Sequence, residues 1–346
     1  MTDNGNFTPF PEVVPPQTVT PIINEPPLLR KIFIGPNGIR AGWRIILFIA
    51  LVFVLTFLAR TIKHLFSPAV PRDLNAPLEP VHEISSRGIG LFLTLLAAWI
   101  MSKIERGRWD DYGLPLRRLF SRDFLFGLFW GFGGLSLVML GLYLTGTFRI
   151  EGLALAGTAI WKYAALWGVV FMIVGLFEEF ILRGYLQFTL ASGIGFWWSA
   201  FLTSALFFYA HISNGGENWI GLTDVFLIGM FLCFTLWRTG DLWFAVGMHA
   251  AWDWGLSFFY SVPDSGTTSL GHLFNVRIQG PAWLSGGSAG PEGSILNIVF
   301  DLLCFVVFAM IYKKRKWVGL NDRRAATSHY VAPATTTILD SSALKP

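Results

Sequence analysis

Long apolar runs, separated by short polar or basic segments, dominate the pattern of this chain. A bilayer is crossed by ~20 consecutive apolar residues, so the runs predict about eight transmembrane helices. They cover residues 43–60, 87–104, 123–145, 160–188, 195–212, 220–238, 241–260 and 294–312. The fourth run is longer than one span needs, which indicates a tilted helix or an interfacial segment. The predicted fold class is therefore all-α, a polytopic membrane helix bundle.

Polar segments flank this apolar region at both ends. Residues 1–28 are polar and rich in proline, and they predict a disordered cytoplasmic arm without a cleavable signal peptide. Residues 29–316 are expected to form one membrane-embedded helical domain. Residues 317–346 are expected to form a flexible cytoplasmic tail.

The composition agrees with a membrane protein. The chain is 53% hydrophobic and 14% charged, whereas a soluble domain is ~25% charged. The net charge of +4 comes from basic residues near the ends of apolar runs, which indicates topology and no nucleic-acid partner. Cys233 and Cys304 lie inside apolar runs, so they are expected to be buried thiols rather than a disulfide or a zinc site.

Basic residues also indicate which ends of the helices face the cytoplasm. The positive-inside rule assigns to that side the loop after the second run and the segment after the last run. The basic residues concerned are Lys103, Arg106, Arg108, Arg117, Arg118, Arg122, Lys313, Lys314, Arg315 and Lys316. An even number of spans then places both termini in the cytoplasm and the long loops 61–86 and 262–292 outside. The membrane is expected to be a cell (inner) membrane.

Two adjacent glutamates interrupt the fourth run, with a basic residue shortly after them. Glu179 and Arg183 are four residues apart, so they share a helix face and are expected to pair. Glu178 is rotated ~140° from Arg183 and stays available as a base. A buried ion cluster that only locks helices together is the structural alternative, but charges inside a membrane span are usually functional.

Two histidines provide further candidate chemistry. His211 ends an aromatic run, and it either bonds a loop carbonyl or helps to hold a water molecule. His249 and Asp253 are four residues apart and share a helix face. They form either a self-contained hydrogen bond or a polar pair in which Asp253 orients His249 toward a reacting carbonyl.

Other polar groups give weaker signals. Asp224, Asn297 and Asp301 lie in apolar runs and are expected to be structural, with Asp301 the first candidate for another role. Walker, HExxH and G-x-S-x-G motifs are absent from the sequence, and no cofactor is expected.

Three motifs, in this order on successive runs, together resemble one known family. They are Glu178-Glu179-x-x-x-Arg183, Phe207-x-x-x-His211 and His249-x-x-x-Asp253. This set resembles the CAAX protease and bacteriocin-processing family (CPBP or Abi), which includes intramembrane glutamic endopeptidases. Residues 109–115 look like the family's entry loop, and the resemblance covers residues 88–260.

The resemblance implies a role for each matched residue. Glu178 would activate the hydrolytic water, and His211 would hold the same water. His249 and Asp253 would stabilise the oxyanion, with Glu179 and Arg183 in support. The family usually has Asn where this chain has Asp253; an ionised carboxylate repels an oxyanion, so Asp253 must be protonated or must orient His249.

This chemistry needs water, so the sequence predicts a cavity open to the cytoplasm. Glu178 and His249 are estimated to lie ~12 Å above the inner edge of the membrane, whereas His211 comes out nearer the outer side. A later start of the fifth span, or a tilted helix, would reconcile the two positions.

We therefore expect an endopeptidase that acts on membrane-associated or lipidated peptides within the lipid bilayer. One alternative is a metal-dependent membrane protease with Glu178, His211 and His249 as zinc ligands. Another is a non-catalytic membrane scaffold, or a proton-coupled transporter that uses Glu178 and Glu179. The chain shows no internal symmetry of the kind common in transporters.

Overall fold

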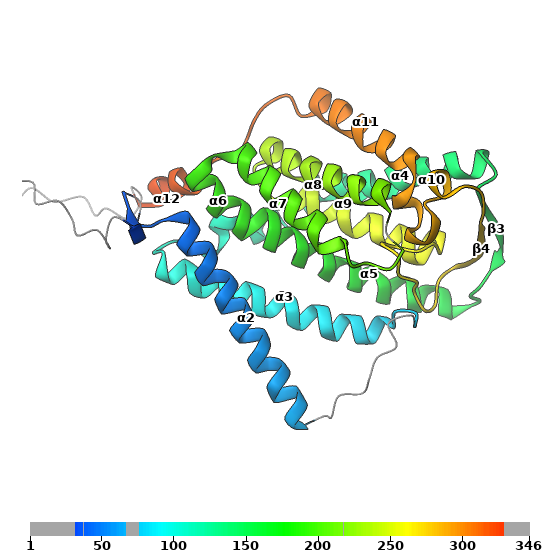
Figure 1. Ribbon diagram of the computed structural model, residues 1–346, viewed down its shortest axis with the longest axis horizontal. Coiled ribbons are helices and arrows are strands. Elements are labelled where there is room, and N and C mark those ends of the chain that lie inside the picture. The colour runs from blue at the N-terminus through cyan, green and yellow to red at the C-terminus, as the bar shows by residue number, and fades with distance from the viewer. Residues whose placement is uncertain (1–31, 37, 67–75, 217, 329–346) are drawn as a thin grey trace, which may run out of the picture.

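The computed structural model describes residues 32–328 except 37, 67–75 and 217. Nine helices follow the apolar runs: α2 (Ala41–Phe66), α3 (Pro80–Ile104), α4 (Arg122–Leu144), α5 (Thr158–Glu179), α6 (Gln187–Ile194), α7 (Phe196–His211), α8 (Trp219–Thr239), α9 (Trp243–Trp254) and α11 (Ile295–Ile311). They run roughly side by side, so that one end of the bundle collects the segments after α3 and α11 (Figure 1). We call this end, which contains residues 105–121 and 312–328, the basic end.

Five helical stretches are long and apolar enough to cross a membrane by length and composition. They are α2, α3, α4, α8 and the continuous stretch Thr158–Ile194, which joins α5 to α6. These stretches mark the chain as an integral membrane protein. Helix α11 is apolar but shorter, and α7 and α9 have 16 and 12 residues, so the count of eight spans stays a prediction.

Strands and short helices occupy the ends of the bundle, a detail that the all-α prediction lacks. At one end, β1 (Ile34–Gly35) pairs with β2 (Gly38–Ile39), and at the other β3 (Phe148–Leu153) pairs antiparallel with β4 (Phe274–Ile278). Helix α10 (Ala282–Ser285) follows β4 in the chain and contacts α11. We call the end with β3 and β4, which contains residues 145–157, 212–216, 218 and 261–294, the loop end.

Side-chain caps define where several helices begin. Asn218 accepts hydrogen bonds from the amides of Ile220 and Gly221 at the start of α8. Ser121 and Ser294 cap α4 and α11 in the same way. Each cap satisfies backbone N–H groups that a first helical turn leaves without partners.

Glycines bring α9 unusually close to its neighbours. A Cβ atom on Gly127 of α4 would lie 2.2 Å from the Phe244 carbonyl oxygen, and one on Gly131 would lie 2.2 Å from that of Met248. On the α9 side, a Cβ on Gly247 would lie 2.5 Å from the Phe124 carbonyl oxygen. Such distances are sterically forbidden, so only glycine permits this approach of the two backbones, as in small-residue contacts between membrane helices.

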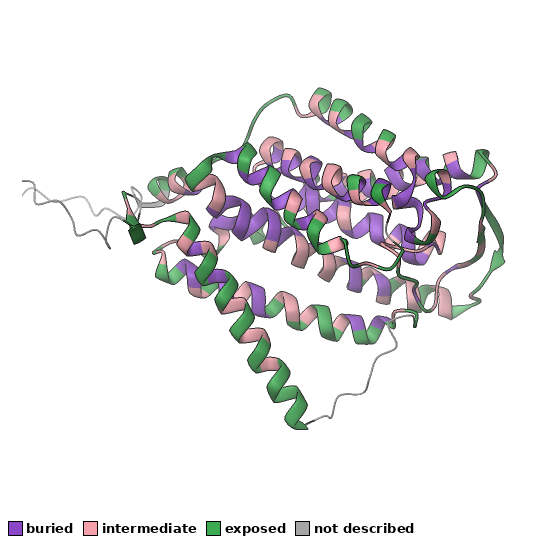
Figure 2. Ribbon diagram, in the orientation of Figure 1, coloured by how far each residue is buried: buried purple, intermediate pink, exposed green. Residues whose placement is uncertain are grey.

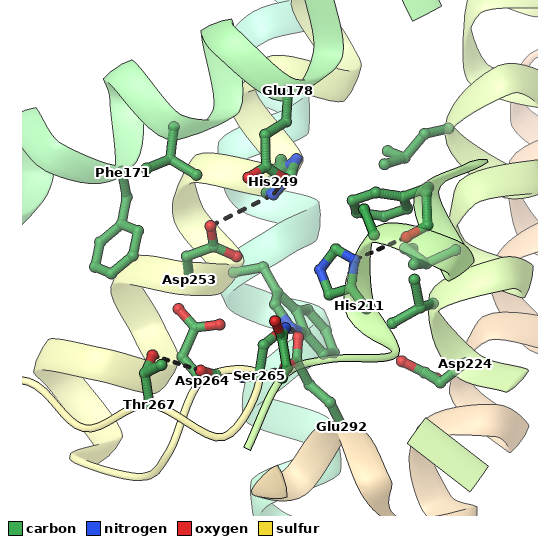
Figure 3. Close-up of a pocket in the computed structure, with 18 of the residues that line it drawn as sticks. Phe171, Glu178, His211, Asp224, His249, Asp253, Asp264, Ser265, Thr267 and Glu292 are labelled. Carbon is green, nitrogen blue, oxygen red and sulfur yellow. Dashed lines mark hydrogen bonds and ion pairs between the residues drawn. The ribbon is translucent and has the colours of Figure 1, made fainter. Parts of the chain in front are cut away.

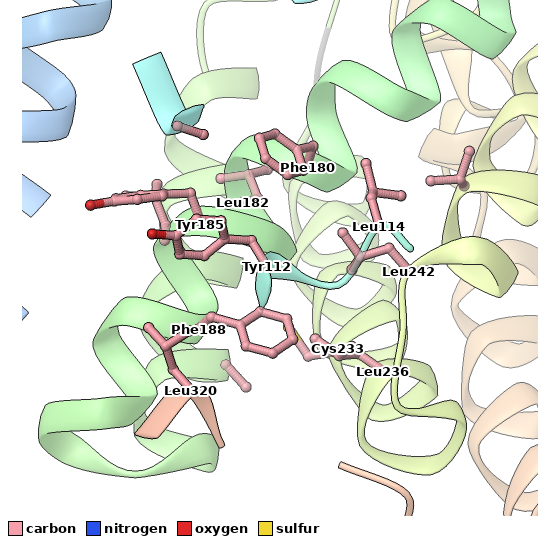
Figure 4. Packing of buried hydrophobic residues seen from close by; sticks show 14 of the residues in the cluster. Tyr112, Leu114, Phe180, Leu182, Tyr185, Phe188, Cys233, Leu236, Leu242 and Leu320 are labelled. Atoms are coloured by element: carbon pink, nitrogen blue, oxygen red, sulfur yellow. The ribbon is translucent and has the colours of Figure 1, made fainter. Parts of the chain in front are cut away.

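Aromatic and aliphatic side chains fill the centre of the bundle toward the basic end (Figure 4). Tyr112, from the loop after α3, stacks in a tilted arrangement on Tyr185, with ring centroids 4.8 Å apart. The opposite extreme is α2, whose outer turns are mostly exposed and diverge from the bundle (Figure 2). An apolar helix with so little protein contact is suited to a surface of lipid.

At the basic end, one buried carboxylate binds side chains from two other helices. Glu105 follows α3 and binds Arg44 of α2 and Arg324 of α12 (Leu320–Ser328), the latter at 2.7 Å. Helix α12 falls within residues 317–346, for which the sequence predicts a flexible tail, so the structure differs from that prediction over Leu320–Ser328. The predicted arm at 1–28 and the end of the tail lie outside the described residues.

Candidate active site

The paired glutamates end α5, where the helix widens into a π-helical segment, Phe180–Leu186. Short π-helical segments inside α-helices frequently occur at functional sites. Glu179 is fully buried, and its Oε1 accepts a hydrogen bond from Arg183 Nη1 at 3.0 Å. This is the pairing that the four-residue spacing predicts.

The same oxygen of Glu179 also contacts an imidazole. Nδ1 of His249, on α9, lies 2.9 Å from Glu179 Oε1, and because a carboxylate accepts, Nδ1 is the donor. Arg183 in turn lies over the ring of Phe207, with its guanidinium carbon 4.5 Å from the ring centroid. Glu179 therefore fixes His249, while Arg183 balances the buried charge.

The second nitrogen of His249 faces two further carboxylates. Its Nε2 lies 3.4 Å from Asp253 Oδ2 and 3.7 Å from Glu178 Oε2. Neither distance is that of a short hydrogen bond, so a proton on Nε2 is not committed to one partner. A second π-helical segment, Gly255–Tyr260, follows this part of α9.

His211 lies at the end of α7 and faces the same space (Figure 3). Its Nδ1 is 2.8 Å from the Phe207 carbonyl oxygen. A carbonyl oxygen can only accept, so Nδ1 carries a proton, and with this tautomer of the imidazole Nε2 is an acceptor. The bond is therefore to a carbonyl of the same helix rather than to a loop carbonyl, and it leaves Nε2 available at the cavity.

A cavity of about 370 Å³ joins these groups. Glu178, His211, His249 and Asp253 all line it, whereas Glu179 and Arg183 lie behind its wall. The side chain of Glu178 is 22% exposed, against 0% for Glu179. The two adjacent carboxylates thus have different surroundings, one in the cavity and one among fixed partners.

The edge of the cavity lies away from the basic end, to which the positive-inside rule assigns the cytoplasm. The exposed residues at its edge are Arg87 in the first turns of α3, Ala210 at the end of α7 and Thr267 in the loop after α9. All three lie toward the loop end. The reason is that α7 ends at His211 there, which also removes the conflict over the depth of His211.

The loop end contributes acidic side chains that the sequence did not single out. Glu292 accepts from the Ser265 amide at 2.8 Å and from Trp252 Nε1 at 3.2 Å. Asp264 accepts from Ser257 Oγ, and burial together with the Asp253 and Glu292 charges raises its pKa well above the usual range. No motif marks these residues, because their neighbours at the site come from distant segments.

The zinc-ligand alternative finds no support in this geometry. Within residues 32–328, apart from the gaps noted, no group of three or more His, Cys, Asp or Glu side chains is placed to hold a metal ion. Cys233 and Cys304 are free and buried, as the sequence predicts.

Comparison with known proteins gives one match. Residues 160–255 match a family model described as type II CAAX prenyl endopeptidase Rce1-like. This segment contains all seven named residues of the three motifs, so the resemblance to the CAAX protease family is confirmed over it. No curated protein and no solved structure matches the chain. The match supports a membrane protease of the CAAX-protease kind.

Proposed function

We propose that the protein is an intramembrane endopeptidase in which Glu178 activates a water molecule for attack on a peptide bond. The observation that carries this proposal is the contrast between the paired glutamates. Glu179 is held by hydrogen bonds from Arg183 and His249, whereas Glu178 lines the cavity at 3.7 Å from His249 Nε2, beyond the length of a hydrogen bond. A general base needs to reach its substrate, and Glu178 can.

The reaction uses the side chains in a defined order. The water donates one hydrogen to Glu178 and the other to His211 Nε2, so that its lone pair is free to attack the carbonyl carbon. Glu178 takes the first proton as the new C–O bond forms, and His249 Nε2–H binds the oxyanion. Glu178 then gives its proton to the amide nitrogen, the C–N bond breaks, and a carboxylic acid and an amine leave.

Asp253 has an orienting role in this proposal. Its carboxylate lies 3.4 Å from His249 Nε2, on the side of the ring opposite Glu179. It can hold a proton on Nε2 until an oxyanion competes for it. Where the family usually has Asn, whose neutral amide can donate to the oxyanion, this chain has the Asp253 carboxylate. In this proposal the carboxylate keeps protonated His249 in place as the donor.

The cavity opening bears on the substrate. The basic residues gather at the basic end, which the positive-inside rule assigns to the cytoplasm together with both termini. The cavity opens toward the other end, so we propose that substrates enter from the non-cytoplasmic side of a cell membrane. Such substrates are membrane-associated polypeptides exposed on that side.

Proteomics of cells that express active-site variants tests the proposed activity. Uncut membrane-associated peptides should accumulate with Glu178→Ala and with His249→Ala, and not with Glu151→Ala, a control on β3 that removes an exposed carboxylate away from the cavity. Peptide profiles identical to wild type in both active-site variants would refute the protease.

Thiol labelling tests the proposed orientation. Thr267→Cys lies at the cavity edge, Lys314→Cys lies at the basic end, and both positions are exposed. A membrane-impermeant maleimide added to intact cells should label the first variant and spare the second, with little background from the buried Cys233 and Cys304. The reverse pattern would place the opening in the cytoplasm.

A further inference from the structure

A second polar group lines the cavity and takes no part in the proposed hydrolysis. It consists of Asp224 on α8 and of Asn297 and Asp301 on α11, one helical turn apart. All three residues are buried: Asp224 is 3% exposed, Asn297 is 2% exposed and Asp301 is 1% exposed. In Figure 3, Asp224 lies beyond His211 when viewed from Glu178.

The contacts within this group leave three oxygen atoms without a donor. Asn297 Nδ2 donates to Asp224 Oδ2 at 2.8 Å, which fixes the amide oxygen of Asn297 as an acceptor. The carboxyl groups of Asp224 and Asp301 lie within hydrogen-bonding reach of each other. Among the described residues, nothing donates to Asp224 Oδ1, Asp301 Oδ2 or Asn297 Oδ1.

Buried acceptors without donors are costly, at ~1–3 kcal/mol each, so this arrangement calls for a donor. One proton shared by the two carboxyl groups would satisfy two of the oxygens and leave the Asn297 amide oxygen unpaired. A primary ammonium group carries three N–H donors and a positive charge, and it matches all three acceptors.

The remainder of the cavity wall favours the same kind of ligand. Glu178, Asp253, Asp264 and Glu292 add further carboxyl groups. Among the described lining residues Arg87 is the one Lys or Arg, and it is bound to Glu83 at 3.2 Å. The carboxyl groups outnumber the basic side chains of the lining, Arg87, His211 and His249, so cationic groups are favoured in the cavity over anionic groups.

We propose that Asp224, Asn297 and Asp301 form a subsite that binds a primary ammonium group of the substrate, either a lysine side chain or a free amino terminus. The inference rests on the proposed peptidase function, because the subsite shares its cavity with Glu178. The volume of about 370 Å³ is in the range of small-ligand sites and accommodates a short peptide segment.

Cleavage of matched peptides by the purified full-length protein in nanodiscs tests this subsite. One set of quenched fluorescent peptides is acetylated at the amino terminus and carries lysine, norleucine or glutamate at each position in turn. The second set lacks lysine and has a free amino terminus. The wild type should show a KM at least about tenfold lower for one of the two ammonium sources than for norleucine, a ratio equivalent to ~1.4 kcal/mol.

Two variants test whether the preference for an ammonium group depends on the proposed subsite. Asp301→Asn should bring the KM values for ammonium and norleucine peptides within about twofold of each other. Glu292→Gln is the matched control: it also removes a lining carboxylate, but both of its oxygens have protein donors. It should keep the preference.

A shared proton in place of a ligand predicts no lysine or amino-terminal preference in the wild type, and that outcome would overturn the inference. So would a preference that Asp301→Asn retains, or that Glu292→Gln removes equally, since the general negative charge would then explain it.

Binding without cleavage separates this inference from the proposed function. The preferred ammonium peptide should raise the Tm of Glu178→Gln, and should not raise that of Glu178→Gln with Asp301→Asn. If the wild type cuts nothing but this Tm shift is seen, the subsite stands and the peptidase fails. If peptides are cut with no ammonium preference and no Tm shift, the peptidase stands and the subsite fails.

Discussion

Two buried carboxylates of this molecule, Glu105 at the basic end and Glu179 beside the cavity, are almost equally hidden from solvent. Their side chains are 2% and 0% exposed. Both bind arginine, and each lies near the end of an apolar helix. The two regions nevertheless differ in how fully their hydrogen bonds are satisfied.

Both oxygens of Glu105 have donors. Oε2 accepts from Arg44, Arg324 and Tyr112, and Oε1 accepts from Tyr185 at 2.6 Å. Glu179 in contrast accepts both of its hydrogen bonds through Oε1, and among the described residues nothing donates to its Oε2. A complete network ties helices together, whereas an incomplete one next to a cavity is typical of a site that performs chemistry.

The largest effect is expected from breaking the Glu179 pair. Arg183→Gln removes the guanidinium partner of a fully buried carboxylate, which should lower the free energy of unfolding by ~3–5 kcal/mol. Glu178→Gln, which breaks no buried pair, is the control and should unfold like the wild type. Thermal unfolding in detergent compares them, and equal stability of the two variants would contradict the division of labour between the glutamates.

Catalysis should depend next on His249. Replacing the imidazole by an amide in His249→Gln removes the proposed oxyanion donor and should lower kcat by ~10²–10³-fold. The corresponding change at the loop end, His272→Gln, alters a histidine whose Nδ1 bonds the Ser269 carbonyl, and it should leave kcat unchanged. The measurement is kcat of both variants on one peptide that the wild type cleaves. A wild-type kcat for His249→Gln would exclude His249 as the oxyanion donor.

The complete network at the basic end should respond to acid. Burial alone would raise the pKa of Glu105, but the hydrogen bond and charge of Arg44 outweigh it and lower the pKa. Its stabilisation is therefore fully present above the unfolded pKa of ~4.3 and is lost as pH falls through the lower folded value.

Glu105→Gln makes this dependence measurable. At pH 7 the variant should be less stable than the wild type by ~1.5–3 kcal/mol, the usual size of a hydrogen bond to a charged group. The difference should shrink toward the acid end of a Tm series. A constant difference from pH 7 to pH 3 would show that the carboxylate charge does not stabilise this end.

The smallest effect is expected at Asp253. Asp253→Asn keeps the size of the side chain and supplies a neutral N–H donor, so kcat should change by less than about tenfold. Asp253→Ala supplies no donor and should lose more activity than Asp253→Asn. If the amide variant is the less active of the two, Asp253 acts through its negative charge alone.

The sequence predicted much of this architecture because apolar runs and helical spacing are local properties. The helices begin and end close to the predicted runs, and the pairing of Glu179 with Arg183 followed from a spacing of four residues. The position of Asp301 in an apolar run also marked it as a residue of interest.

Contacts between distant segments could not be obtained in this way. Glu105 binds residues 61 positions before it and 219 positions after it. Glu292 and Asp264 reach the cavity because residues 261–294 return to the end of α9, where Glu292 accepts a hydrogen bond from Trp252. The sequence predicts a cytoplasmic opening, whereas the edge of the cavity lies toward the loop end. The thiol-labelling experiment decides which side of the membrane that end faces.

Isotope labelling in a single turnover tests most directly whether Glu178 activates water. The protein, in excess over a cleaved peptide, reacts once in H₂¹⁸O, and mass spectrometry then locates the label. Direct attack by water predicts one ¹⁸O atom in the new peptide carboxylate and none in the Glu178 side chain. An unlabelled peptide carboxylate with ¹⁸O in Glu178 would mean that this side chain attacks the substrate itself, and the account would be contradicted.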